Sequence, residues 1–293
     1  MSPGHILDLF DKLISPILNY AGEVWGFNKG LQVERSHLSF CKRTLGVKKS
    51  TQNSFIYGET GRLDCINRSY FLIIKYWLKV CTSNESKYIK AVYNVLRADS
   101  ERHPNTVNWA SQVKQLLSIT GFYNVWLNQG VGEDEMFLKI FKQRLKDNFI
   151  QKWNADLNNS SRAIFYKTFA SFDFKLYLNV INISKYREAF TRLRVSSHRL
   201  EVEVGRWAKP NSIPFDNRLC RQCGVLEDEY HFLIECKSHI DIRKQYIKSY
   251  FWKHPSFLKC LQLINSTNVT ELKRLSVFIY KAFEIRRILN TGS

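Results

Sequence analysis

Three cysteines and one histidine in the C-terminal third of the sequence have the spacing of a metal site. Two residues separate Cys220 from Cys223, seven separate Cys223 from His231, and four separate His231 from Cys236. A cysteine pair at this spacing can offer both sulfurs to one ion from a single turn, and zinc takes four such ligands in a tetrahedron. Because four protein ligands leave no open position, the pattern predicts a structural Zn²⁺ site and not a catalytic one.

The residues around this cluster favour the same assignment. Gly224, directly after the second sulfur, permits the backbone conformation that such a turn needs. Residues 227–236 are expected to form a short helix, on which His231 and Cys236 would lie about 140° apart. Cys236 is therefore expected at or just beyond the helix end. His239 and His254 are weaker alternatives to His231, and the other cysteines are interpreted as buried or incidental thiols: Cys41, Cys65, Cys81 and Cys260.

Apolar residues recur at intervals of three and four over most of the chain, which predicts a mainly α fold. Helices are expected at 7–18, with a kink at Pro16, and at 30–45, 64–80, 107–119, 133–153, 162–170, 185–195 and 271–289. A short strand is possible at 200–204. The predicted organisation is a helical region at 1–153, a linker and connecting helix at 154–183, with the linker at 154–160, and a C-terminal zinc-binding region at 184–293. Apolar residues at every fourth position of helix 133–153 are expected in the core: Phe137, Phe141, Leu145, Phe149 and Trp153.

Positive charge is spread along the whole chain. There are 44 Lys and Arg residues against 26 Asp and Glu, a formal charge of +18. Such an excess in a folded protein favours a polyanionic partner, usually RNA or DNA. On the helix at 64–80, Arg68, Lys75 and Lys79 share a narrow sector, which can face a phosphate backbone, although an ordinary solvated face is the preferred interpretation.

More basic residues flank the cysteine and histidine cluster. The candidates for nucleic-acid contacts there are Arg192, Arg194, His198, Arg199, Arg206, Lys237, Arg243 and Lys244. The alternative is a solvated helix face, or internal ion pairs with Glu188, Glu201 and Glu203.

The cellular compartment is expected to be reducing and intracellular, nucleus or cytoplasm. Seven cysteines, most of them scattered, argue against a disulfide framework. The first residues lack the features of a signal peptide, and the most apolar run, 71–80, is too short to span a bilayer. No membrane partner is therefore expected.

Two blocks of sequence resemble non-LTR (LINE-type) retrotransposon reverse transcriptases. The segment from Arg192 through Gly205-Arg206-Trp207, followed by the four predicted ligands, is similar to their C-terminal cysteine-rich region. Residues 9–26 and 40–47 resemble the stretch after the polymerase palm, where the thumb begins, whereas about 85–180 carries no family motif. The resemblance implies a helical thumb-like part followed by a CCHC zinc-stabilised part, which together grip template RNA and target DNA.

Catalytic motifs of that family are not found in the sequence. Two-metal nucleotidyl transfer needs closely clustered carboxylates, and the chain has no pair of adjacent aspartates. Pro214-Phe215-Asp216 is the nearest approach to a nuclease motif and lacks its downstream partners. The chain is therefore expected to be a noncatalytic fragment that binds nucleic acid, with a possible polymerase portion upstream. The alternatives are a zinc-stabilised helical protein-interaction module and a non-functional mobile-element relic.

Overall fold

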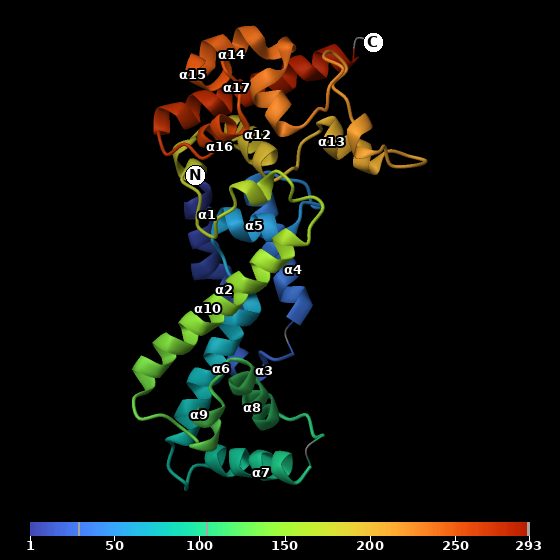
Figure 1. Cartoon of the computed structure of the whole chain (residues 1–293). Coiled ribbons are helices and arrows are strands. Elements are labelled where there is room, and N and C mark those ends of the chain that lie inside the picture. Colours follow the sequence, from blue (N-terminus) through green and yellow to red (C-terminus); the bar gives the residue numbers. More distant parts are fainter. Residues whose placement is uncertain (29, 104, 292–293) are drawn as a thin grey trace. The chain divides into compact units, whose positions relative to one another are not determined.

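A computed structural model describes residues 1–28, 30–103 and 105–291, with the side chains of residues 30 and 31 outside the description. The protein is 68% helix, and the described residues form no strand, which confirms the mainly α fold (Figure 1). Among the described residues, extended backbone pairs only in two isolated bridges, Thr60 with Phe174 and Leu219 with Leu226. Within the same ranges, no helix is long and apolar enough to cross a membrane.

The chain divides into two compact units that interleave in sequence. Unit 1 comprises residues 1–8, 39–62 and 156–293, and unit 2 comprises 9–38 and 63–155. Three of the four division points fall within helices: α1 (Pro3–Leu9), α4 (Gly30–Leu45) and α10 (Asp134–Asn158). The fourth, after Arg62, falls in the loop between α5 (Asn53–Thr60) and α6 (Cys65–Cys81). The division of the sequence at 154 and 184 into functional regions stays a prediction.

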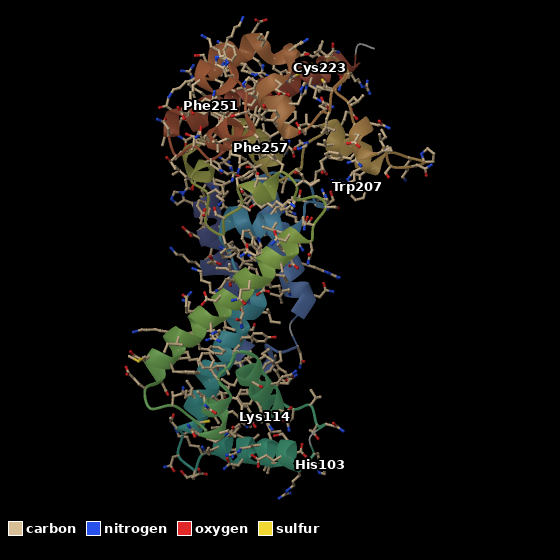
Figure 2. All side chains as sticks on the ribbon, in the orientation of Figure 1. His103, Lys114, Trp207, Cys223, Phe251 and Phe257 are labelled. Carbon is tan, nitrogen blue, oxygen red and sulfur yellow. The ribbon has the colours of Figure 1, made fainter. Side chains whose placement is uncertain are left out.

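Unit 1 is built on the packing of two C-terminal helices against each other. Its helices are α5 (Asn53–Thr60), α11 (Tyr177–Val180), α12 (Ser184–Arg194), α13 (Glu201–Val204), α14 (Ile240–Tyr246), α15 (Ser249–Trp252), α16 (Phe257–Ile264) and α17 (Val269–Thr291), with shorter turns η2 (Tyr166–Thr168), η3 (Gly205–Trp207), η4 (Phe215–Asn217), η5 (His231–Glu235) and η6 (Lys237–His239). Helix α17 packs against α11, α12 and α14. Phe190 of α12 and Phe278 of α17 are fully buried, and α15 adds Phe251 (Figure 2).

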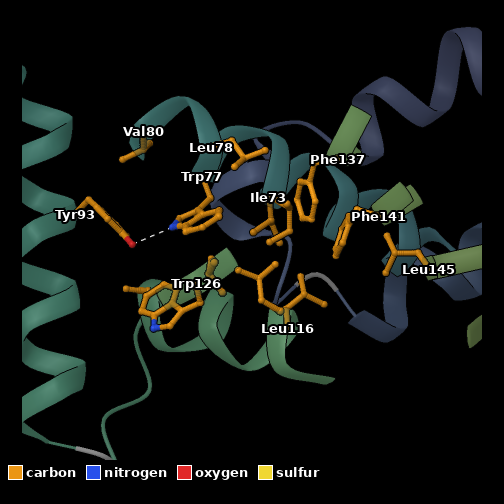
Figure 3. Packing of buried hydrophobic residues seen from close by; sticks show 14 residues of the cluster. Ile73, Trp77, Leu78, Val80, Tyr93, Leu116, Trp126, Phe137, Phe141 and Leu145 are labelled. Atoms are coloured by element: carbon orange, nitrogen blue, oxygen red, sulfur yellow. Dashed lines mark hydrogen bonds between the residues drawn. The ribbon is translucent and has the colours of Figure 1, made fainter. Parts of the chain in front are cut away.

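Unit 2 has a core of its own. Its helices are η1 (Phe10–Ile14, a π-helical turn), α2 (Ser15–Leu18), α3 (Gly22–Trp25), α6 (Cys65–Cys81), α7 (Tyr88–Arg102), α8 (Trp109–Ile119) and α9 (Tyr123–Leu127). Helix α6 is the centre of this unit, and its apolar face carries Ile73, Ile74 and Trp77 into a cluster with Leu116 and Phe141 (Figure 3). The indole nitrogen of Trp77 donates to the hydroxyl of Tyr93 at 2.9 Å.

Most helices expected from periodicity are present. Helix α6 begins after Asp64, whose carboxylate accepts from the amide of Asn67 at 3.1 Å. Helix α17 begins after Asn268, whose side chain accepts from the amide of Glu271 at 3.1 Å. The five apolar residues expected in the core of α10 are all buried. These elements confirm the helices that the apolar periodicity predicted, and the capping side chains mark where two of them begin.

Three local predictions are wrong. The linker expected at 154–160 is helical to Asn158, because Leu157, only 3% exposed, continues the four-residue apolar spacing. The possible strand at 200–204 is the short helix α13, whose first amide, on Glu201, donates to the Glu227 carboxylate at 2.7 Å. The helix expected at 162–170 is reduced to the turn η2, since Tyr166 and Phe169 both insert into the core.

Candidate metal centre

Cys220 and Cys223 lie on one tight turn. The carbonyl of Cys220 accepts from the amides of Cys223 at 3.3 Å and Gly224 at 2.8 Å, and the amide of Cys220 donates to the carbonyl of Val225 at 2.7 Å. Gly224 has a φ of +70°, in the left-handed region that glycine adopts without strain. The turn therefore needs a glycine at this position, as the sequence predicted.

His231 and Cys236 are joined by the π-helical turn η5. The amide of His231 donates to the carboxylate of Asp228 at 2.7 Å, which fixes the start of the turn. The amide of Cys236, directly after η5, donates to the carbonyl of His231 at 2.8 Å. Because this hydrogen bond spans five residues, as in a π-helix, the side chains of His231 and Cys236 are not held at the wide angle that an α-helix would give them. Cys236 lies just beyond the helix end, which confirms the expectation.

The four side chains gather closely enough to hold one metal ion. Their ligand atoms all lie within 4.8 Å of one another, and the sulfurs of Cys223 and Cys236 are 3.9 Å apart. A tetrahedral zinc site with zinc–sulfur bonds of about 2.3 Å places its sulfurs about 3.8 Å apart. Neither buried ring nitrogen of His231 has a hydrogen-bond partner among the described residues, the carboxylate of Glu235 being 3.7 Å away. A donor set of three thiols and one imidazole fits zinc.

Burial controls the protonation of these ligands. It raises the pKa of Cys236 to about 12 and raises the pKa of Cys220, so both thiols are protonated at neutral pH without metal. It also lowers the pKa of His231, which keeps the imidazole neutral and able to bind a cation.

Zinc binding is therefore expected to release protons and to weaken as the pH falls. A metal must displace the protons of thiols whose pKa values are raised, so acid competes directly with zinc. Competition titrations with a chelator between mildly acidic and mildly alkaline pH measure this, and calorimetry in buffers of different ionisation enthalpy measures the protons released. An affinity that does not change with pH would exclude thiolate ligands.

Arg243 and His239 support this segment from inside. The guanidinium of Arg243 donates to the carbonyls of Leu233 at 2.9 Å and Cys236 at 3.0 Å, and burial lowers its pKa to about 10. Nδ1 of His239 faces the carbonyl of Phe232 at 3.3 Å, and burial lowers the pKa of this histidine to about 4. His239 is thus not in the group of four, and Arg243 is an internal support where the sequence suggested a phosphate contact.

Two further residues expected to meet nucleic acid are also internal. Arg194 is 2% exposed, and its guanidinium donates to both carboxylate oxygens of Glu59 at 3.0 Å. His198 is buried with its Nε2 3.0 Å from the carboxylate of Glu229. Burial alone would raise the pKa of Glu229, but hydrogen bonds from His198 and Ser196 lower it. Buried groups with these partners cannot reach a phosphate, so the expected contacts are replaced by structural roles.

The remaining basic candidates lie at the surface or close to it. Arg192 pairs with Glu188 at 3.1 Å, and the half-buried Arg206 lies 3.5 Å from Glu203. Ion pairs with Glu188 and Glu203 are the alternative to nucleic-acid contacts that the sequence left open for these arginines. The exposed candidates are Arg192, Arg199, Lys237 and Lys244 in unit 1, and Arg68, Lys75 and Lys79 on α6 in unit 2.

A second group with metal-binding side chains was not expected from the sequence. Glu34, His37 and Cys65 of unit 2 place three ligand atoms within 4.8 Å. However, Glu34 accepts from the amide of Cys65 at 2.6 Å at the start of α6 and lies 3.0 Å from Nδ1 of His37. These contacts give the carboxylate a structural role at a helix N-terminus. No spacing signal could have found the group, since Cys65 is far from the other two in sequence.

Comparisons with known proteins add no assignment. No protein-family model matches the chain, and no curated protein or solved structure does either. The resemblance to retrotransposon reverse transcriptases therefore stays a prediction.

Proposed function

We propose that the chain is a noncatalytic nucleic-acid-binding part, similar to the post-palm region of a non-LTR reverse transcriptase, and that the metal group is a structural zinc site within it. The observation that carries the proposal is a concentration of cations around Lys48 in unit 1. The pKa of Lys48 is lowered, mainly by burial and next by the nearby guanidinium of Arg199. The pKa of Lys42 is also lowered, mainly by burial and next by the positive charge of Arg162.

Unit 1 also has a groove in which these cations lie. The groove has a volume of about 680 Å³ and runs along α12, α17 and the residues after α4. Six cationic side chains line it, against the two carboxylates of Glu188 and Glu284: Lys48, Lys185, Arg192, Arg199, Arg286 and Arg287. Repulsion among gathered cations is relieved when a phosphate chain lies across them, which supports a polyanionic ligand.

The pairs already present in the groove do not prevent this. Arg287 and Glu284 are both exposed, and the exposed Arg192 pairs with the half-buried Glu188. Ion pairs at the surface contribute little free energy. They can therefore exchange a carboxylate for a phosphate at low cost. Arg286 differs, because its guanidinium is held by Glu227 at 2.6 Å and Glu201 at 3.3 Å. We assign it the task of fixing α17 beside the turn that carries Cys220 and Cys223.

Binding to a short RNA or DNA is expected to weaken steeply as salt rises. Each phosphate contact contributes about 0.9 to the slope of log K against log salt on a DNA duplex and about 0.7 on a single strand. Arg192→Gln together with Arg199→Gln should therefore lower the slope by about 1.8 on a duplex and about 1.4 on a single strand. Fluorescence anisotropy over a salt series measures it. Lys253→Gln, an exposed charge of unit 1 outside the groove, is the control and should leave the slope unchanged. A flat salt response in the wild type would remove the proposal and favour a protein-interaction module.

A further inference from the structure

We propose that Trp207 is a stacking platform for an unpaired nucleobase, so that unit 1 prefers single-stranded nucleic acid to uniform duplex. This inference rests on the nucleic-acid binding proposed above and names the class of ligand. Trp207 ends the turn η3 and keeps 65% of its surface exposed (Figure 2). An indole this exposed is unusual, because tryptophan is highly buried on average.

One face of the indole is already occupied by a cation. The guanidinium of Arg162 lies over the ring, 5.7 Å from its centroid. Arg162 is itself held in place by the carbonyl of Ser50 at 3.1 Å and the carboxylate of Glu203 at 3.3 Å. Since the ring remains mostly exposed with Arg162 on one side, the opposite face is open to a planar ligand. Every nucleobase offers a flat π surface that stacks on such a ring.

The backbone that carries Trp207 is fixed from behind. A Cβ on Gly205 would lie 2.8 Å from Cγ of Arg218, so only glycine permits this approach. Arg218 then donates to the carbonyls of Val202 at 2.7 Å and Ile213 at 2.9 Å, and the amide of Ile213 donates to the carbonyl of Gly205 at 2.8 Å. The platform is therefore ordered before binding, which reduces the entropy lost when a base stacks on it.

Arg162, which lies over the ring, also connects Trp207 to the proposed phosphate contacts. Arg162 donates to the carbonyl of Ser50 at 3.1 Å, two residues after Lys48, and Lys48 lines the groove. A strand whose phosphates follow these cations brings a base to Trp207. Aromatic rings beside a basic track are what sequence-tolerant single-strand binding requires. A duplex, with its bases already stacked, gains nothing from the ring except at a frayed end.

The test compares Trp207→Ala and Trp207→Phe with the wild type on a short single-stranded DNA and on the duplex of the same sequence. Stacking on one aromatic ring predicts that Trp207→Ala weakens single-strand binding about 5- to 150-fold and leaves duplex binding nearly unchanged. Trp207→Phe should retain most of the affinity. Tyr250→Ala is the matched control, because Tyr250 is 57% exposed with the ammonium of Lys259 4.8 Å from its ring centroid, yet lies outside the groove. It should leave both affinities unchanged.

An abasic site moved along the single strand locates the stacked base. In the wild type, one position should reduce affinity, and in Trp207→Ala the same position should have no further effect. If Trp207→Ala binds both probes like the wild type while Arg192→Gln with Arg199→Gln still weakens binding, the stacking proposal is wrong and the proposed function stands. Equal losses on single strand and duplex also overturn it. A wild type that binds neither probe rejects the proposed function itself.

Discussion

A Cys223→Ser variant is expected to lose its metal and to unfold locally between about residues 219 and 239. A hydroxyl is a far weaker zinc ligand than a thiolate, and a structural zinc contributes about 10–16 kcal/mol to the folding of small zinc peptides. Loss of a structural metal belongs to the few single changes that cost more than about 4 kcal/mol. Zinc analysis of the purified protein and hydrogen exchange resolved by peptide measure the two effects.

The matched control for this variant is Cys81→Ser. Cys81 is a half-buried thiol of unit 2, outside the group of four. The control should keep its zinc and its exchange pattern. In Cys223→Ser, faster exchange should be confined to unit 1, since unit 2 has its own apolar core. Retention of one full equivalent of zinc by Cys223→Ser would contradict the ligand assignment.

The second large effect is expected at the ion pair of Glu59 and Arg194. Glu59 is fully buried, and besides Arg194 it accepts from the hydroxyl of Tyr177 at 2.7 Å. The guanidinium lies over the ring of Phe169, 4.6 Å from its centroid, and donates to the carbonyl of Ile264 at 2.9 Å. Removing one partner of a buried pair leaves the other charge without compensation and costs about 3–5 kcal/mol. Urea unfolding of Glu59→Gln and of Arg194→Met should show losses of this size.

The double variant distinguishes charge from packing. Glu59→Gln combined with Arg194→Met removes both charges, so it should cost clearly less than the sum of the two single changes. If the Arg194→Met variant unfolds like the wild type but binds RNA more weakly, the buried structural role is wrong. Arg194 would then contact nucleic acid, as the sequence predicted.

Local patterns were sufficient for the metal group and for the strongest helices. The four candidate ligands lie within one short segment, so their spacing and the glycine at 224 contain most of the geometry. The helix α6 has both a capping Asp64 and a dense apolar face. By contrast α7 was not predicted, although Ile89, Val92, Tyr93 and Leu96 recur at intervals of three and four residues. The periodic signal for this helix is present in the sequence and was overlooked.

Long-range pairing explains what the sequence could not reveal. Arg194 lies in an arginine-rich segment that resembles a nucleic-acid contact, but its partner Glu59 is 135 positions away. Nothing local distinguishes it from Arg192, which is exposed. The stacking role of Trp207 likewise depends on Arg162 lying over its ring. Whether an arginine meets solvent or a buried carboxylate is decided by tertiary packing, which periodicity does not describe.

The proposed structural role of the C-terminal cluster requires that Cys220, Cys223, His231 and Cys236 bind one metal ion. X-ray absorption at the zinc edge of the purified wild-type protein tests this directly. It should show three sulfur neighbours at about 2.3 Å and one nitrogen at about 2.0 Å. A spectrum dominated by oxygen and nitrogen neighbours, or a protein that takes up no zinc, would contradict the account.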